Sequence, residues 1–208
     1  MRLTVSLRFS PTHRIKVGTL FDLGRDTAFE YDRGFLATGL NLAPFRLPPR
    51  SGILVYDRSG NMDTFGVFED SLPDGWGRRL VDVAYRQRFG RLHVASAAGL
   101  LHADFRTPGD EYALLFKLTD ALTHDYSAKE ELFRRATLNV LEHNRDDHLK
   151  NFAFLMDEQG RWSLAPFYDF TYSDGPNGWQ TLSVAGEGAN PTQADLDRLA
   201  HEVGLRSL

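Results

Sequence analysis

The sequence predicts an α+β fold, with a small β-rich subdomain at residues 1–90 and a mostly helical lobe at residues 91–208. Three observations support this division. Segments within residues 1–70 alternate apolar and polar side chains, which is the period of a half-buried strand. From residue 96 onward, apolar residues recur at helical spacing instead. Within this helical part, two apolar runs flank a turn and predict a β-hairpin directly after a polar loop.

The strands of the first part follow one another closely. Residues 2–9 alternate Leu3, Val5, Leu7 and Phe9 with polar neighbours. Further strands are predicted at residues 14–23, 27–32 and 52–57, with a turn at 23–26 and a proline-rich extended loop at 37–52. Residues 71–77 carry turn residues, and residues 78–89 are typical of a helix.

The second part is predicted to contain three helices and the hairpin. Leu114, Leu115, Leu118 and Leu122 share one helix face, and a helix at 127–143 begins with a capping-box pattern from Ser127 to Glu130. Residues 151–170 predict the hairpin, with Gly160 in its turn. The third helix is expected from about Thr192, ending at Gly204.

Composition excludes several classes of function. The net charge is −4 and the pI is near 6.0, so no overall basic field favours binding to nucleic acid. The chain has no cysteine, which excludes disulfides, thiolate metal sites and a cysteine nucleophile. No apolar run is long enough for a signal peptide or a membrane span, so we expect a soluble cytoplasmic protein.

The polar loop "HNRDDHLKNF" at residues 143–152 is hard to explain by packing, because apolar segments flank it on both sides. It leads into the predicted hairpin, whose second strand ends in "APFYDF" and returns Asp169 towards the loop. Asp146, Asn151 and Asp169 follow the order of the catalytic aspartate, asparagine and later aspartate of protein kinases. Carboxylate and amide oxygens are the ligands that Mg²⁺ prefers, which predicts a phosphoryl-transfer site.

These motifs resemble the C-terminal signature of the HipA-type serine/threonine kinases, bacterial toxins of toxin–antitoxin modules linked to persistence. In that family an Asp-x-His-x-Lys-Asn pattern precedes a hairpin and a Leu-x-Pro-x-Tyr-Asp pattern. The matching residues here are Asp146, His148, Lys150, Asn151, Leu164, Pro166, Tyr168 and Asp169. The stretch "FGVFEDSLPDGWGRRL" at residues 65–80 resembles the family's N-terminal part. The resemblance implies a distantly protein-kinase-like fold for the helical lobe.

The resemblance also implies roles for single residues. Asp146 matches the family's catalytic base, and Asn151 and Asp169 match its Mg²⁺ ligands. His148, Lys150 and Tyr168 match positions that line the nucleotide phosphates, so ATP and Mg²⁺ are the expected cofactors. The implied partners are a protein substrate and a helix-turn-helix, HipB-like antitoxin, which would supply the contact with DNA.

One departure from the family is large. The glycine-rich cover and the strand lysine that hold ATP lie, in the family, between the N-terminal part and the helical lobe. Here that interval is almost absent, and the only lysines are Lys16, Lys117, Lys129 and Lys150. A direct join of the two parts would expose a large apolar surface. We therefore expect a break in the backbone between Arg86 and Ala95.

Three interpretations remain open at this point. The chain is a HipA-type kinase from whose sequence a segment has been omitted, or a scaffold or pseudokinase that keeps a partial site and binds a partner. The third is an unrelated metal-dependent hydrolase, in which His143 and His148 would bind the metal, although their spacing is a weak signal.

Overall fold

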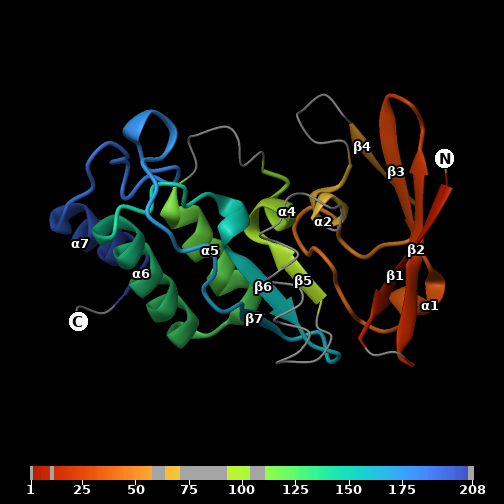
Figure 1. Ribbon diagram of the computed structural model, residues 1–208. Helices are drawn as coiled ribbons and strands as arrows, with labels where there is room; N and C mark the ends of the chain where they lie inside the picture. Colours follow the sequence, from red (N-terminus) through yellow and green to blue (C-terminus); the bar gives the residue numbers. More distant parts are fainter. Residues whose placement is uncertain (1, 10–11, 58–63, 71–92, 104–110, 206–208) are drawn as a thin grey trace. The chain divides into compact units, whose positions relative to one another are not determined.

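The structure, a computed structural model (Figure 1), describes residues 2–9, 12–57, 64–70, 93–103 and 111–205. They form two compact units. The first comprises Met1–Asp104 and Phe154–Arg161, and the second comprises Phe105–Ala153 and Trp162–Leu208. The predicted α+β class is confirmed, since an antiparallel sheet dominates the first unit and helices dominate the second. The predicted boundary between residues 90 and 91 lies outside the described residues and stays a prediction.

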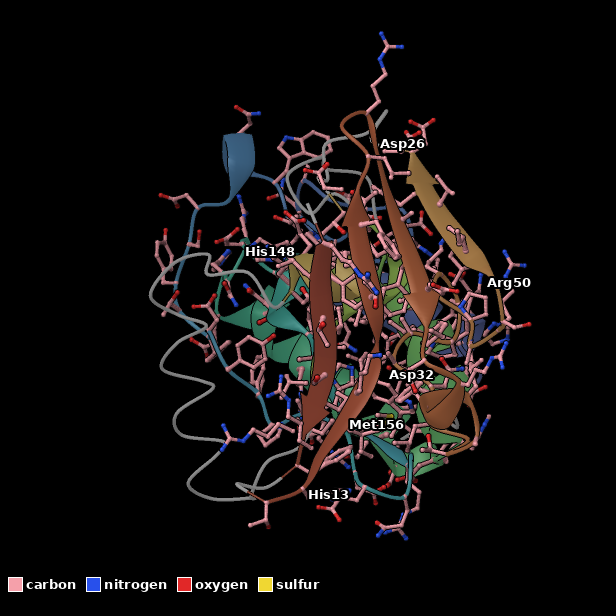
Figure 2. All side chains as sticks on the ribbon, turned by 90° about the vertical axis from the view of Figure 1, so that its right-hand side faces the viewer. His13, Asp26, Asp32, Arg50, His148 and Met156 are labelled. Atoms are coloured by element: carbon pink, nitrogen blue, oxygen red, sulfur yellow. The ribbon has the colours of Figure 1, made fainter. Side chains whose placement is uncertain are left out.

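The first unit is built on a four-stranded antiparallel sheet with the order β1-β2-β3-β4. Its strands are β1 (Arg2–Arg8), β2 (Arg14–Asp22), β3 (Asp26–Tyr31) and β4 (Ile53–Asp57). Figure 2 shows the strands side by side, with Asp26 at the start of β3 and Asp32 just past its end. The four predicted strands are confirmed.

The alternation predicted for β1 holds only in part. Leu7 and Phe9 are buried, whereas Leu3 is 47% exposed. β1 is an edge strand with a neighbour on one side only, so its first residues lack the cover that a central strand receives.

Aromatic rings fill the core of this unit. Phe29 on β3 packs edge-on against Tyr31 and also contacts Phe68, with ring centroids 4.9 and 4.8 Å away. The Tyr31 hydroxyl donates to the carbonyl of Leu47 at 2.6 Å, which fixes the predicted loop 37–52 onto the sheet. Gly18 on β2 lies so close to β3 that an added Cβ would lie 2.2 Å from the carbonyl oxygen of Glu30. The position therefore requires glycine.

The short helices of the first unit are α1 (Arg33–Leu36), α2 (Gly66–Glu69) and α4 (Ala97–Leu101), and the last follows strand β5 (His93–Ser96). The buried carboxylate of Asp70, after α2, accepts hydrogen bonds from the backbone N–H and the hydroxyl of Ser96 at 2.8 and 2.7 Å. The Ser96 hydroxyl in turn accepts from the N–H of Gly99, as an N-cap of α4.

Replacing Gly99 with alanine is expected to destabilise the first unit by roughly 1–3 kcal/mol, the range typical of overpacking. An added Cβ would lie 2.0 Å from Asp70 Oδ2 and 2.9 Å from the carbonyl oxygen of Gly66. The matched control is Gly34→Ala on α1, where an added Cβ meets only the Asp32 carboxylate at 3.1 Å. Urea unfolding should separate the two variants, and equal stabilities would contradict the packing described for Gly99.

The predicted turn at 71–77 and helix at 78–89 lie outside the described residues. The same holds for most of the interval in which a backbone break was expected. Its described part, His93–Ala95, belongs to the continuous strand β5.

A second sheet has the strand order β5-β6-β7, with β6 (Ala153–Met156) and β7 (Trp162–Leu164) forming the predicted hairpin. The Asp157 carboxylate shapes its turn by accepting from the backbone N–H groups of Gln159 and Arg161, each at 2.9 Å. Gly160 has a φ of 79°, in the left-handed region that glycine adopts without strain. The predicted hairpin and its glycine turn are confirmed.

Three longer helices, α5 (Tyr112–Thr123), α6 (Tyr126–Leu141) and α7 (Gln193–Glu202), belong to the second unit (Figure 1). Two short 3-10 helices, η1 (Leu149–Asn151) and η2 (Pro176–Gly178), interrupt its loops. Of the leucines predicted to share the buried face of α5, Leu115, Leu118 and Leu122 are buried. Leu114 is half-buried. No helix among the described residues combines the length and the apolar character needed to cross a membrane.

The ends of α6 and α7 test the predicted caps. The prediction that Ser127 caps α6 is wrong, because the Asp125 carboxylate accepts from the N–H of Ser127 and α6 begins at Tyr126. The predicted cap of α7 is confirmed. Thr192 and Asp195 form a capping box, in which the N–H of Thr192 donates to the Asp195 carboxylate at 2.7 Å.

Candidate active-site loop

The polar loop leaves α6 through a left-handed turn at His143, whose φ is 53°. The N–H of Asn144 donates to the carbonyl of Asn139 at 2.9 Å, and the N–H of His143 donates to that of Val140 at 3.4 Å. This is the Schellman arrangement that commonly ends helices, here with histidine at the position where glycine is most frequent. It turns the chain sharply away from the axis of α6.

The backbone of the loop then lies between two other segments of the second unit. The N–H of Arg145 donates to the carbonyl of Ser173 at 3.1 Å, and the N–H of Ser173 donates to that of His143 at 3.0 Å. On its other side, the Arg145 carbonyl accepts from the N–H and the hydroxyl of Thr181 at 3.1 and 2.9 Å. The loop is therefore held by backbone bonds, as a strand would be.

Asp146, the predicted base, is exposed on this supported backbone; 57% of its side chain is accessible to solvent. Its backbone carbonyl accepts a hydrogen bond of 2.8 Å from the side-chain amide of Asn151, the predicted metal ligand. Because the Nδ2 atom of Asn151 makes this bond, the orientation of its amide group relative to the loop is defined. The structure thus brings these two predicted site residues together.

The three residues predicted to line the nucleotide phosphates lie in or against the loop. His148 Nε2 is 3.8 Å from the Asp146 carboxylate. The Tyr168 hydroxyl, from the chain after β7, donates to the backbone carbonyl of Lys150 at 2.5 Å. The end of the hairpin is therefore attached directly to the loop, as the sequence order suggested.

Asp169 follows immediately after Tyr168 and is exposed. Its φ of 55° lies in the left-handed region, where aspartate and asparagine are several-fold enriched among residues other than glycine. The tilted pair of Phe167 and Phe170, with ring centroids 5.0 Å apart, flanks this bend.

The residues at the loop suit a magnesium ion better than a zinc ion. Asn151 offers an amide oxygen and Asp169 a carboxylate, and Mg²⁺ usually takes one or two protein oxygens together with water and substrate phosphates. Within the described ranges, no three side chains from His, Asp and Glu are gathered into a metal-binding group. The exposed His143 and the half-buried His148 therefore have no third such ligand there, and the hydrolase interpretation gains no support.

All four lysines of the chain lie in the described residues. Lys16 on β2 pairs with Asp32 at 2.9 Å, and Lys129 on α6 lies 3.9 Å from Asp120. Lys117 is exposed on α5, and Lys150 belongs to the loop itself. Only Lys16 is on a strand, and it belongs to the first unit.

A residue that the sequence analysis missed is the second aspartate of the loop. Asp147 is fully buried. Its Oδ2 accepts from the Tyr112 hydroxyl at 2.5 Å and from the Gln180 side chain at 3.1 Å. Its Oδ1 accepts from the N–H groups of Thr181 and Leu182 at 3.0 and 3.2 Å. Burial raises the pKa of Asp147 to about 6, against the opposing effect of these hydrogen bonds.

This raised pKa predicts how stability depends on pH. The folded chain holds the proton of Asp147 more tightly than the unfolded chain, so between about pH 4 and 6 folding takes up a proton. The contribution of Asp147 to the free energy of unfolding therefore falls as pH rises through this window. Relative to Asp147→Asn, the wild type should gain about 2 kcal/mol between pH 7 and pH 4.5. Urea unfolding at both pH values measures this difference.

Asp195→Asn is the matched control, because hydrogen bonds from Thr192 lower the pKa of that buried carboxyl below its ordinary value. Its contribution to stability is present above the ordinary pKa of 3.8 and is lost only as pH falls below that value, so between pH 7 and pH 4.5 the wild type should gain no stability relative to this variant. Parallel pH profiles for the wild type and Asp147→Asn would contradict the assignment.

Two family models match the chain. The one described as the HipA-like C-terminal domain matches residues 73–208, which is more than half of the sequence. The one described as the HipA N-terminal domain matches residues 12–109. The chain therefore belongs to the HipA-like family, which confirms the resemblance drawn from the loop and hairpin motifs.

Among solved structures, the chain matches one from the complex of HipA, HipB and operator DNA of the toxin–antitoxin system of Shewanella oneidensis MR-1. The two are 17% identical with a TM-score of 0.48, and the match covers 96% of this chain and 53% of the other. This chain thus spans about half the length of that solved relative. No curated protein matches it.

Proposed function

We propose that this protein is a HipA-like serine/threonine kinase, which transfers the γ-phosphoryl group of ATP to a hydroxyl of a protein substrate. The observation that carries the proposal is the hydrogen bond from the Asn151 side chain to the backbone carbonyl of Asp146. It joins two residues of the kinase-type order in one supported loop, with the Asp146 carboxylate left exposed to solvent.

In this proposal the exposed carboxylate of Asp146 accepts a hydrogen bond from the substrate hydroxyl and later its proton. Asn151 and Asp169 would hold Mg²⁺, which neutralises charge on the phosphates when it is bound. His148, Lys150 and Tyr168 would line the phosphates. The first two supply donors, while the hydroxyl of Tyr168 holds the Lys150 carbonyl. Catalysis of this kind rests on positioning and electrostatics.

We extend the proposal to a partner, a helix-turn-helix antitoxin that would make the contact with DNA. The solved complex named above contains HipA, HipB and operator DNA. The net charge of −4 on this chain argues against strong binding to DNA without such a partner.

The test is phosphoryl transfer from γ-labelled ATP by the purified full chain, with and without Mg²⁺, to itself and to added protein substrates. We expect incorporation of label onto serine or threonine that requires Mg²⁺ and is abolished by chelation. No transfer to any protein, under conditions in which the chain is folded and Mg²⁺ is present, would overturn the kinase proposal.

The placement of the lysines favours a second candidate, a scaffold or pseudokinase that binds the antitoxin without transferring phosphate. Protein kinases hold ATP with a strand lysine. Lys16 is the only lysine on a described strand, and it pairs with Asp32 in the first unit, whereas the polar loop belongs to the second unit. Calorimetric titration with Mg·ATP separates the candidates. A kinase must bind the nucleotide, whereas a scaffold would form its complex with the antitoxin while leaving ATP unbound.

A further inference from the structure

The two neighbouring aspartates of the loop, Asp146 and Asp147, differ sharply in their exposure to solvent. Asp146 faces solvent and Asp147 is fully buried, and they are adjacent in a stretch of chain whose backbone is bonded on both sides. The two side chains leave neighbouring Cα atoms of this backbone, so the attachment of Asp147 also restrains the backbone from which the Asp146 side chain departs.

That attachment reaches two separate segments of the second unit. Tyr112 comes from the first turn of α5, whereas Gln180, Thr181 and Leu182 come from the chain before α7. All four donors to the Asp147 carboxylate belong to buried residues. The carboxylate thus ties the loop to a helix and to the segment that borders the loop backbone.

The network continues into α6, the helix from which the loop departs. The Tyr112 hydroxyl also accepts from the Asn139 side chain at 2.9 Å, and the Asn139 oxygen accepts from the Asn144 side chain at 2.9 Å. Tyr112, Asn139 and Asn144 are all buried. The loop is therefore anchored at Asn144, before the exposed aspartate, and at Asp147, directly after it.

We propose that Asp147 is a positioning residue. Held by its hydrogen bond from the Tyr112 hydroxyl, it keeps the Asp146 carboxylate in the direction required for phosphoryl transfer. This inference rests on the proposed kinase function. Burying a carboxylate among polar donors is a costly way to stabilise a fold, since apolar residues of similar volume often do so as well or better. A fully hydrogen-bonded buried network does, however, restrict the loop to one geometry.

The test compares Tyr112→Phe and Asp147→Asn in the full chain. Tyr112→Phe removes the 2.5 Å hydrogen bond and keeps the ring that packs edge-on against Phe152, so it is the variant expected to fold. Displacement of a reacting group by about 1 Å costs on the order of 10²-fold in rate. We expect kcat to fall about 10- to 100-fold in both variants, with the KM for ATP unchanged.

A readout independent of activity accompanies the kinetics. Hydrogen exchange of the backbone amides should accelerate at residues 144–151 and 180–182 in both variants, and stay unchanged in α7. The control is Asp195→Asn, which removes another buried carboxylate of the same unit, in the capping box of α7. It should raise exchange at the start of α7 and leave kcat and loop exchange unchanged.

The outcomes are distinguishable. Unchanged loop exchange in Tyr112→Phe would overturn the positioning role whatever the activity. Faster exchange throughout the second unit, with kcat falling only in proportion to the folded fraction, would also overturn it by assigning Asp147 to overall stability. If the wild type transfers no phosphoryl group, the kinase proposal fails. Faster local exchange would then show that Asp147 holds the loop, but it would have no role in phosphoryl transfer.

Discussion

Replacing Asp146 by asparagine is expected to lower phosphoryl transfer by about 10²- to 10⁴-fold, the usual effect of removing a general base. Asparagine has the same shape but cannot accept the proton of the substrate hydroxyl. The side chain is 57% exposed, and its backbone carbonyl, which Asn151 contacts, remains in the variant. The variant should therefore fold like the wild type, with stability within about 0.5 kcal/mol. Rates with γ-labelled ATP and urea unfolding measure the two effects.

Asp197→Asn is a suitable control, since it removes an exposed carboxylate from α7 in the same unit. It should leave the rate unchanged. Label incorporation by Asp146→Asn at the wild-type rate would exclude Asp146 as the base. Another group would then have to accept the proton of the substrate hydroxyl.

Replacing Asp169 by asparagine is expected to reduce transfer by at least about 10²-fold and to raise the Mg²⁺ concentration needed for half-maximal rate. The change replaces a negatively charged carboxylate with a neutral amide, and hard cations such as Mg²⁺ strongly prefer carboxylate ligands. Asparagine tolerates the left-handed φ of 55° as well as aspartate does, so the bend after Tyr168 should persist. A Mg²⁺ titration of the rate, with unfolding monitored in parallel, tests this expectation.

The same segment offers a matched control for this change. Asp174 is exposed and accepts a hydrogen bond from the Tyr172 hydroxyl at 2.8 Å. Asp174→Asn should leave the Mg²⁺ dependence unaltered. An Asp169→Asn variant with wild-type rate and wild-type Mg²⁺ requirement would remove Asp169 from the proposed metal site.

The elements that the sequence predicted well are those set by local chemistry. The hairpin depends on Gly160 and on the apolar runs beside it, and the cap of α7 depends on Thr192 and Asp195, three residues apart. The cap of α6 was placed two residues too late because Ser127 and Glu130 satisfy the same local pattern. Asp125 competes for the position and accepts from both the N–H and the hydroxyl of Ser127.

The support of the candidate site could not be predicted in the same way, because it depends on residues far apart in the chain. Asp147 and Tyr112 are 35 positions apart, and Asp147 and Thr181 are 34 apart. One signal in the sequence does point to it. Tyr112 and Asn139 fall on the buried faces of α5 and α6. A polar side chain at such a position needs a buried partner.

Under the proposed function, the hydrogen bond from Tyr168 to the carbonyl of Lys150 has a consequence for ligand binding. It closes a loop of chain between residues 18 positions apart, and the entropy of that closure is lost when the protein folds. A ligand that touches both the polar loop and Asp169 then finds them already tethered and need not order the segment itself. Preorganisation of this kind strengthens binding without adding a contact. Tyr168 would thus contribute to affinity through an atom that the ligand never touches.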